Sequence, residues 1–374
     1  MRDVYVVGVS MIKFGRYPDT DVAALGAQAA LLALKDAGMS IKDVQMLASG
    51  NLFQANATVG QRIMQQIGQT GIPVINVTNA CATGSTAFRE AYFAVGSGEV
   101  EVAMAVGSEQ MGKAGLLGGA GESVEGILGS GLMPAIFGYA GLEHMRTYGT
   151  TMEHFAKVSV KNHKHSAKNP LSQYQNEVSL DEVLNARMVA YPNTLYMCCP
   201  TGDGAAAAIL VSEAVMKKSG SKPVKIAASV LTSDPWTARD LTLPDVNTLT
   251  RNAAKIAYEK AGVGPEDLDL VECHDCFATA ELLHYENLGL CKDGEAGRGL
   301  DEGWFGWGGR TPVNVSGGLL SKGHPLGATG IANIFEVTTH LRGQAGARQV
   351  ENAKVGLAHV IGLGSACTIN ILTA

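Results

Sequence analysis

The sequence predicts a duplicated α/β protein built from two similar cores. Three observations lead to this fold class: a repeat between the halves of the chain, the alternation of strands and helices in each half, and the length of 374 residues. A chain of this length exceeds the size at which one hydrophobic core usually stops growing. Hydrophobic residues make up 46% of the chain and charged residues 17%, which is typical of a compact globular protein.

The repeat relates residues 29–38 (AALLALKDAG) to residues 253–262 (AAKIAYEKAG). In both copies an aspartate follows at the same distance, Asp43 and Asp267, and a short apolar run comes next. Each copy is therefore predicted to form a helix that ends at a glycine, then a turn and a strand. Chance similarity between two alanine-rich helices is the alternative interpretation.

The first half continues in the same alternating order. Residues 72–77 (IPVINV) are predicted to form a strand that leads into a glycine-bearing turn, and residues 102–106 form the next strand. The helix between them is predicted from apolar residues at i, i+3, i+4 and i+7 spacing, which are Phe88, Ala91, Tyr92 and Val95.

The second half repeats this order, with a strand at 312–315, a glycine-rich turn over 316–324 and a closing strand at 355–360. Its helix is predicted from Ile331, Ile334, Val337 and Leu341. The segment between the two cores fits neither copy, so we expect an inserted loop domain. The expected bounds are 1–114 plus 191–222 for the first core, 115–190 for the loop domain and 223–374 for the second core.

Charge and composition exclude several classes of function. The net charge of −6 and the pI near 5.9 do not indicate binding to nucleic acid or to an anionic membrane surface. No apolar run approaches the ~18 residues that a membrane helix needs. With no secretory signal and no Ser-Lys-Leu ending, a cytoplasmic location is expected, where the seven cysteines stay reduced.

The first candidate for chemistry is Cys81, which lies in the stretch 79–86 (NACATGST) between a predicted strand and a predicted helix. The unpaired N–H groups at a helix start favour a thiolate and are able to hold the oxyanion of a carbonyl under attack. A buried structural cysteine is the alternative, because free cysteine is among the most buried residue types.

The second candidate is the stretch 272–277 (ECHDCF), which follows a predicted strand. The spacing of Cys273 and Cys276 admits zinc or a redox pair, but zinc needs four ligands and no second Cys-x-x-Cys exists. His274 and Cys276 are better interpreted as a hydrogen-bond donor and a proton shuttle at the carboxyl end of a strand. The remaining cysteines, Cys198, Cys199, Cys291 and Cys367, are interpreted as structural.

The third candidate is His324, which is held between Gly323 and Pro325 in the glycine-rich turn. It occupies in the second half roughly the place that Cys81 occupies in the first. If the halves pack by pseudo-twofold symmetry, a nucleophilic cysteine and a basic histidine meet at one site. Gly362 and Gly364 are candidates for backbone N–H groups around a second oxyanion, and an ordinary glycine-bearing strand end is the equal alternative.

These motifs resemble the sterol-carrier-protein-type thiolases, a subgroup of the thiolase superfamily with a His-Asp-Cys-Phe motif, and the resemblance runs from Val4 to Leu372. The stretches that carry it are 79–86 (NACATGST), 137–141 (FGYAG), 143–145 (EHM), 162–166 (NHKHS), 198–201 (CCPT), 274–277 (HDCF) and 316–330. The resemblance implies a five-layer αβαβα arrangement of two βαβαβαββ cores with an inserted loop domain, assembled as a homodimer or tetramer.

The resemblance also implies the chemistry of acyl-CoA thioesters, with CoA as a substrate and no metal or covalently bound cofactor. Cys81 is then the nucleophile and His324 the base that activates it. His274 helps to hold the enolate oxygen, and Cys276 is the second proton shuttle. The shuttle cysteine of ordinary thiolases lies near the C-terminus, where this chain has Val360-Ile-Gly362. The resemblance implies that Gly362 still supplies the backbone N–H group that binds the oxyanion.

Other activities compete with thiolytic cleavage or Claisen condensation. A decarboxylating ketosynthase shares Cys81 and His324 but needs no second thiol. Some relatives are aldolases, or acyltransferases that act only beside a small zinc-ribbon/OB-fold partner protein. A non-enzymatic lipid-binding role gives no reason for two thiols and two histidines. The acyl chain is not identified, although the aromatic stretch 303–309 (GWFGWGG) is either a packed loop or the wall of an acyl pocket.

Overall fold

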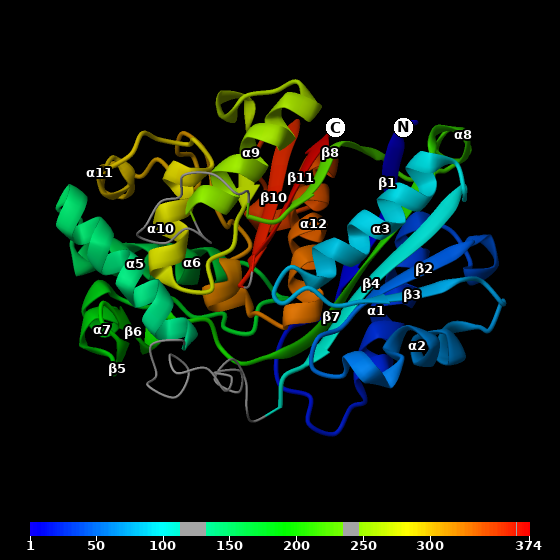
Figure 1. Cartoon of the computed structure of the whole chain (residues 1–374), viewed down its shortest axis with the longest axis horizontal. Helices are drawn as coiled ribbons and strands as arrows, with labels where there is room; N and C mark the ends of the chain where they lie inside the picture. The colour runs from blue at the N-terminus through cyan, green and yellow to red at the C-terminus, as the bar shows by residue number, and fades with distance from the viewer. Residues whose placement is uncertain (113–131, 235–246, 364) are drawn as a thin grey trace.

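The computed structural model describes residues 1–112, 132–234, 247–363 and 365–374 (Figure 1). The glycine-rich stretch 116–131 and Gly364 lie outside the described residues. None of the helices in the described ranges is long and apolar enough to cross a membrane.

A nine-stranded mixed sheet forms the frame, in the order β3-β2-β4-β7-β1-β8-β11-β10-β9. Its strands are β1 (Val4–Met11), β2 (Met46–Gly50), β3 (Val74–Val77), β4 (Val102–Gln110), β7 (Asp203–Ser212), β8 (Val224–Thr232), β9 (Leu270–Glu272), β10 (Val355–Gly362) and β11 (Ala366–Thr373). The first half contributes β3-β2-β4-β7-β1 and the second half β8-β11-β10-β9. The halves meet where Tyr5 and Val6 of β1 pair with Lys225 and Val224 of β8.

The strand order confirms the duplication that the repeat predicts. Counted outward from the junction, each half has two antiparallel pairings followed by parallel pairing. The equivalent of β3 in the second half is the segment 312–315. It was expected to be a strand, but it makes one isolated bridge, between Val271 and Val313. Asn314 has a φ of 54°, so the backbone leaves the extended conformation before a ladder forms.

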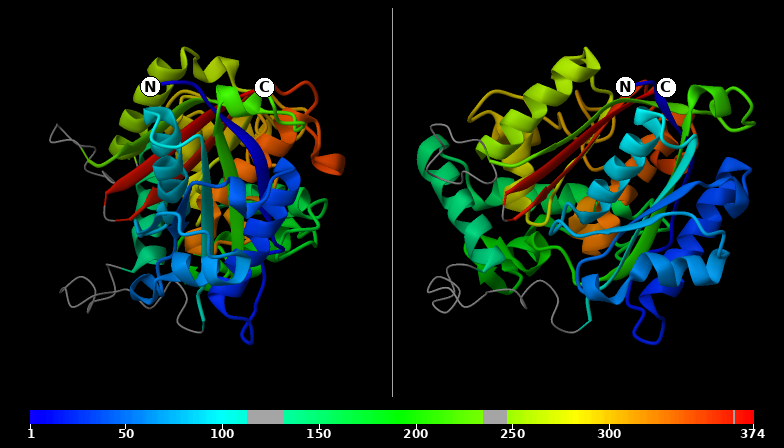
Figure 2. Two further views of the ribbon diagram at one scale, coloured as in Figure 1. Left: turned by 90° about the vertical axis from the view of Figure 1, so that its right-hand side faces the viewer. Right: turned by 45° about the vertical axis from the view of Figure 1, so that its right-hand side comes forward.

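The helices arrange the sheet into five layers, as Figures 1 and 2 show. Helix α1 (Val22–Ala37) packs on β1 and β7, with α2 (Val59–Ile67) beside it; α9 (Asn247–Ala261) packs on β8 and β11, with α10 (Ala278–Asn287) beside it. Helices α3 (Thr83–Ser97) and α12 (Leu326–Arg342) pack on each other between the two halves of the sheet. The alternation of helix and sheet is therefore αβαβα, the arrangement that the resemblance implies.

Glycines allow α3 and α12 to approach closely at their N-terminal ends. A Cβ at Gly84 would lie 2.4 Å from the carbonyl oxygen of Gly327, and a Cβ at Gly330 would lie 2.4 Å from the backbone nitrogen of Ser85. Any side chain at these positions would push the two helix starts apart. The packing therefore brings the residues just before each helix, which include Cys81 and His324, toward one another.

The segment between β4 and β7 forms helices α5 (Met133–Tyr148), α6 (Met152–Ser166) and α7 (Leu180–Asn185) and a small hairpin of β5 (Met188–Ala190) and β6 (Asn193–Thr194). It packs on the second half of the chain: Phe137 of α5 stacks on Phe277 with ring centroids 5.0 Å apart. The remaining short elements are α8 (Glu213–Met216), α11 (Ala296–Asp301), η1 (Ile41–Asp43), η2 (Ala55–Ala57), η4 (Leu195–Met197), η5 (Pro265–Asp267), η6 (Gly318–Lys322) and η7 (Gly346–Arg348).

Two aromatic residues of the stretch 303–309 pack against neighbouring helices. Phe305 is 1% exposed and stacks on Tyr285 of α10 at 3.7 Å, and Trp307 lies against His165 of α6 at 4.5 Å. Lys168 places its ammonium group 3.9 Å from the Trp307 ring centroid. The stretch therefore joins the second core to the inserted helices.

Candidate active site

Cys81 lies in a tight turn between β3 and α3. Ala80, the residue before it, has a φ of 47°, which is rare for a residue with a side chain and is characteristic of strained functional turns. The Thr83 hydroxyl stabilises the turn, since it accepts the N–H of Asn79 at 2.8 Å and donates to the carbonyl of Ala80 at 2.6 Å. The turn presents the Cys81 thiol at the start of α3 while leaving the residue only 3% exposed.

His324 lies between η6 and α12, where Pro325 begins the helix. Its Nδ1 lies 2.8 Å from the Thr329 hydroxyl, and that hydroxyl donates its single hydrogen to the carbonyl of Pro325 at 3.0 Å. The hydroxyl must therefore accept from Nδ1–H, because it has no second hydrogen to donate. Nε2 then carries the lone pair, and it has no hydrogen-bond partner among the described residues. The backbone contact of Thr329 thus leaves Nε2 as the ring nitrogen able to accept a proton.

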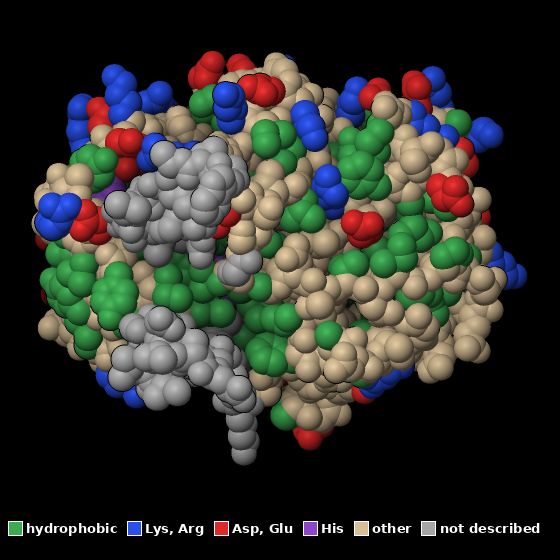
Figure 3. Space-filling view, viewed as in Figure 1, with side chains coloured by type: hydrophobic (Ala, Val, Ile, Leu, Met, Phe, Trp, Pro, Cys, Tyr) green, Lys and Arg blue, Asp and Glu red, His purple; other side chains and the backbone are tan. Residues whose placement is uncertain are grey.

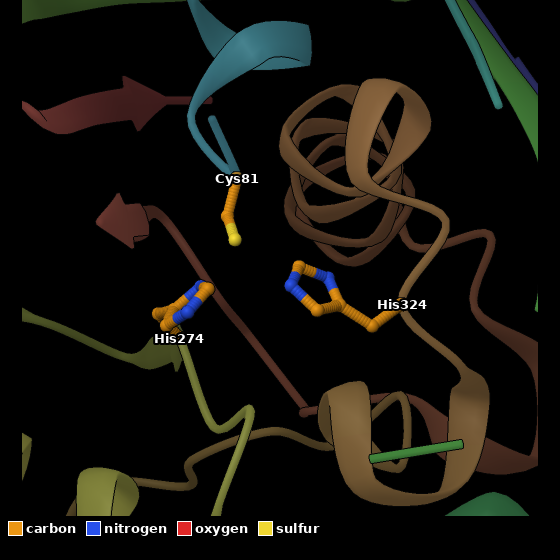
Figure 4. Close-up of side chains that lie close together, drawn as sticks. All are labelled: Cys81, His274 and His324. Carbon is orange, nitrogen blue, oxygen red and sulfur yellow. The ribbon is translucent and has the colours of Figure 1, made fainter. Parts of the chain in front are cut away.

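His274 follows β9 and completes a group of three side chains. The Cys81 sulfur and one ring nitrogen each of His274 and His324 all lie within 4.8 Å of one another. The two imidazoles meet edge to face, with ring centroids 5.1 Å apart and an interplanar angle of 78° (Figure 4). Figure 4 also shows one ring nitrogen of His324 turned toward Cys81 and His274. The two helix starts therefore meet, as the pseudo-twofold argument predicts.

Cys276 lies two residues beyond His274, and its thiol is not among the atoms of this group. Its backbone carbonyl accepts the N–H of Cys199 at 2.9 Å, next to a bridge between Cys198 and Phe277. Burial, and then Cys199 and Cys81, raise the pKa of the Cys276 thiol well above its usual range. Cys199, which the sequence suggested was structural, is therefore a third buried thiol close to the site.

Burial controls the protonation of all three central groups. It raises the pKa of Cys81 to about 12, with a smaller contribution from Glu109. It lowers the pKa of His274 to about 3 and that of His324 well below its usual value. Burial of Cys81 therefore opposes the thiolate that the helix start is expected to favour. The resting pair is a neutral thiol beside a neutral imidazole.

Glu109, at the end of β4, is a site residue that no sequence motif indicates. It is fully buried and accepts the backbone N–H groups of Leu52, Phe53 and Gly327 at 2.9–3.2 Å. Burial raises its pKa to about 7, although these N–H groups act in the opposite direction. Because Gly327 is in the first turn of α12, Glu109 connects the first half of the chain to the helix that follows His324.

A buried ion pair connects the two loops that carry the histidines. Lys322 and Glu272 are both 0% exposed, with Nζ 3.4 Å from the carboxylate, and Glu272 also accepts the backbone N–H of Ser316 at 3.0 Å. Each partner lies two residues before a site histidine. Asp275 adds a second connection, since it accepts the N–H groups of Leu319 and Leu320 in η6. The spacing of His274 and His324 is therefore fixed by polar contacts inside the second half.

Gly362 lies at the end of β10, against the Cys81 turn. A Cβ there would lie 2.6 Å from the carbonyl oxygen of Asn79 and 3.1 Å from the Ala80 side chain, so only glycine fits without moving the turn. Cys273, the other member of the Cys-x-x-Cys pair, contacts Asn314. Among the described residues, Cys273 belongs to no group of three potential metal ligands.

Comparison with known proteins places the chain in a family. Residues 4–214 match the model of the thiolase N-terminal domain, and residues 232–373 match the thiolase C-terminal domain-like model. The chain belongs to the thiolase family. It is a thiolase-superfamily acyltransferase with the two-domain thiolase fold.

Relatives of this thiolase cover nearly all of the chain. Human sterol carrier protein 2 is 45% identical over 99% of this chain and 72% of its own length. The benzoylsuccinyl-CoA thiolase subunit BbsB of Thauera aromatica is 39% identical over 97% of this chain and 95% of its own length. A solved structure described as an Ltp2-ChsH2(DUF35) aldolase has the same fold, with a TM-score of 0.87, 24% identity and coverage of 100% of this chain and 98% of that chain.

Proposed function

We propose that this thiolase is an acyl-CoA C-acyltransferase that cleaves a 3-oxoacyl-CoA by thiolysis, or forms one by Claisen condensation, through an acyl-Cys81 intermediate. The proposal rests on one observation. The Cys81 thiol lies close to the His324 ring, and Nε2 of that ring carries a lone pair because Nδ1–H donates to Thr329. A thiol beside an oriented base is the arrangement of nucleophilic catalysis. Both imidazoles and the thiol are buried, which excludes water from a reactive thioester.

In the cleavage direction, His324 Nε2 takes the Cys81 proton as the sulfur bonds to the 3-keto carbon. Because the pKa of the free thiol is about 12, the thiolate does not accumulate beforehand, and proton transfer accompanies the attack. The oxyanion that forms collapses and breaks the bond between C2 and C3. The electron pair of that bond passes to the departing enolate.

The enolate oxygen rests against His274, whose depressed pKa keeps the ring neutral, and neutral imidazole donates one hydrogen bond. The Cys276 thiol gives its proton to the enolate carbon, which yields the first acyl-CoA product. Free CoA then gives its thiol proton to the Cys276 thiolate as the CoA sulfur attacks the acyl group, and Cys81 leaves as a thiolate that takes back the proton held on His324. The residues need no metal or covalently bound cofactor for these steps.

Steady-state thiolysis tests the proposal. Wild-type protein is expected to turn over 3-oxoacyl-CoA repeatedly only when free CoA is present, and to consume about one equivalent per site without it. The variant Cys276→Ala is expected to lose at least about 100-fold in kcat, the usual size of a general acid–base contribution. Cys367→Ala, which removes an equally buried thiol in β11, is the matched control and retains turnover. Equal losses in both variants, or multiple turnovers without CoA, contradict the proposal.

A second copy of the chain is the proposed homo-oligomeric partner, at the edge strand β3. In the described sheet β3 pairs only with β2, and its Ile75 is 40% exposed beside a surface cavity of about 470 Å³. An open edge with an exposed apolar residue is a surface that pairs with another strand. Figure 3 shows hydrophobic side chains on the part of the face that holds α3 and β3.

Aldol cleavage beside a small partner protein is the second candidate. The aldolase with the same fold is described together with a second component, ChsH2(DUF35). The Thauera aromatica relative is described as a subunit, which also indicates an assembly. An aldol substrate would be cleaved without CoA and without an acyl-Cys81. The dependence of cleavage on free CoA therefore separates the two candidates.

A further inference from the structure

The three central side chains also form a set of metal ligands. The sulfur of Cys81 and one nitrogen each of His274 and His324 lie within 4.8 Å of one another, and the three residues are at most 3% exposed (Figure 4). Among the described residues, these three form the group of potential metal ligands whose donor atoms lie within this distance of one another. Thiolate sulfur and imidazole nitrogen are the donors that Zn²⁺ prefers.

The distances fit a tetrahedral Zn²⁺ after a small closure. Zinc–sulfur bonds of about 2.3 Å and zinc–nitrogen bonds of about 2.0 Å place neighbouring ligand atoms roughly 3.5 Å apart. Donor atoms within 4.8 Å therefore need to approach by about 1 Å or a little more. Side-chain rotation supplies a shift of this size without rearranging the elements that carry the residues.

In each of the two histidine rings, one nitrogen is available to bind a ligand. His324 donates Nδ1–H to Thr329, and its Nε2 has no partner. Metal-bound histidines usually have this second contact, which fixes the tautomer and the ring orientation. His274 Nδ1 is also buried, with no hydrogen-bond partner in the part of the chain that the structure describes. Unpaired buried polar atoms are costly, and a cation that binds both rings removes that cost.

The surrounding charges allow a cation here. The nearby cation, Lys322, is neutralised by Glu272 at 3.4 Å. The buried carboxyl group of Glu109 is close enough to affect the Cys81 thiol. A bound Cys81 thiolate offsets one charge of a divalent ion, and the Glu109 carboxyl group offsets the other when it is ionised. A fourth position stays open for water, as in three-ligand zinc sites.

We propose that Cys81, His274 and His324 form a Zn²⁺ site that competes with acylation of Cys81. Binding makes one Zn–S bond and two Zn–N bonds and releases the Cys81 thiol proton to solvent. The inhibitory consequence rests on the proposed function, whereas the metal site itself does not. Zn²⁺ and an acyl group then exclude each other, because both occupy the same sulfur.

Spectroscopic titration tests the site without any enzyme assay. The reduced protein is freed of metal with a chelator and titrated with Co²⁺, and thiolate-to-cobalt absorption in the near ultraviolet is recorded with the visible bands of tetrahedral Co²⁺. One equivalent per chain is expected, and Zn²⁺ is expected to displace it. Cys81→Ser is expected to abolish the charge-transfer band, and Thr329→Val to weaken binding about 10- to 100-fold.

A matched control and an activity readout complete the test. Cys291→Ser, which changes a half-buried thiol outside the group, is expected to bind Co²⁺ as wild type does. A band that survives Cys81→Ser, or no band in wild-type protein, overturns the proposal. If acyl transfer occurs, Zn²⁺ should block it and a chelator should restore it. A Cys81-dependent band in a protein that never transfers acyl groups would keep the metal site and refute the proposed function.

Discussion

At the residue scale, the proton positions around His324 follow from one hydroxyl group. Thr329 donates to the carbonyl of Pro325 and accepts from Nδ1 of His324, so the basic nitrogen is the one that faces Cys81. The threonine contacts neither the sulfur nor a substrate in this account, and it acts by orienting the base.

Replacing Thr329 with valine is expected to lower kcat/KM about 10- to 100-fold, because the His324 ring loses the contact that fixes its tautomer. Thr329→Ser is expected to restore most of the activity. Thr338→Val is the matched control, since Thr338 is a buried threonine of the same helix whose hydroxyl has no hydrogen-bond partner within the described ranges. Similar losses in Thr338→Val and Thr329→Val would contradict a positioning role.

The raised pKa of Cys81 predicts an unusual pH dependence of alkylation. A thiol with the ordinary pKa near 9 is mostly ionised above that pH, whereas Cys81, at about 12, stays neutral. The rate of iodoacetamide reaction at Cys81 in the free protein is therefore expected to rise about tenfold per pH unit from pH 7 to 10 without levelling near 9. Peptide mapping assigns the rate to Cys81, and a model thiol peptide gives the reference curve. A plateau below pH 9 would mean that the helix start outweighs burial.

At the scale of elements, the site depends on how β9 and η6 are connected. The ion pair of Lys322 and Glu272 joins the strand end before His274 to the turn before His324. Both charges are fully buried, so each depends on the other for compensation.

Lys322→Met is expected to destabilise the protein by about 3–5 kcal/mol, because Glu272 is left as a buried charge without its cation. Urea unfolding measures the change, and a far-ultraviolet spectrum checks the fold. Lys217→Met provides the matched control, since the Lys217–Glu213 pair is exposed to solvent and is expected to contribute little. If both variants unfold at the same urea concentration as wild type, the buried pair does not hold the loops together.

Sequence reasoning predicted the elements well where it relied on local pattern and on the repeat. The helices at 29–38 and 253–262, the turn before α3 and the turn before α12 all follow from spacing and glycines. The segment 312–315 was predicted less well, since whether an apolar run joins a ladder depends on the backbone at Asn314. Glu109, Cys199 and Thr329 were not predicted, because their importance comes from contacts that local sequence does not encode.

At the scale of the whole molecule, duplication explains why one site draws on both halves. Cys81 precedes α3 and His324 precedes α12, two helices in equivalent positions that pack through glycines. The pseudo-twofold relation was visible in the sequence, so the convergence was predictable. The protonation states were not, because they depend on burial by both halves together.

Substitution of Ile75 by lysine is expected to weaken self-association, because a charge on the open β3 edge opposes pairing with a second strand. Analytical ultracentrifugation over a range of protein concentrations is the measurement, with at least a tenfold increase in the dissociation constant expected. Ile256→Lys is the control, since Ile256 is 36% exposed on α9, away from that edge. A monomeric wild-type protein, or equal effects of the two variants, would contradict assembly through β3.

The most direct test of the proposed function is the covalent intermediate on Cys81. Purified protein would be incubated with a panel of acyl- and 3-oxoacyl-CoA thioesters, aromatic ones included, and examined by intact-protein mass spectrometry beside Cys81→Ala and Cys276→Ala. The account predicts an acyl adduct in wild type and in Cys276→Ala and none in Cys81→Ala, with the added mass identifying the acyl group. An adduct that persists in Cys81→Ala, or cleavage of a 3-oxoacyl-CoA with no adduct at Cys81, would contradict it.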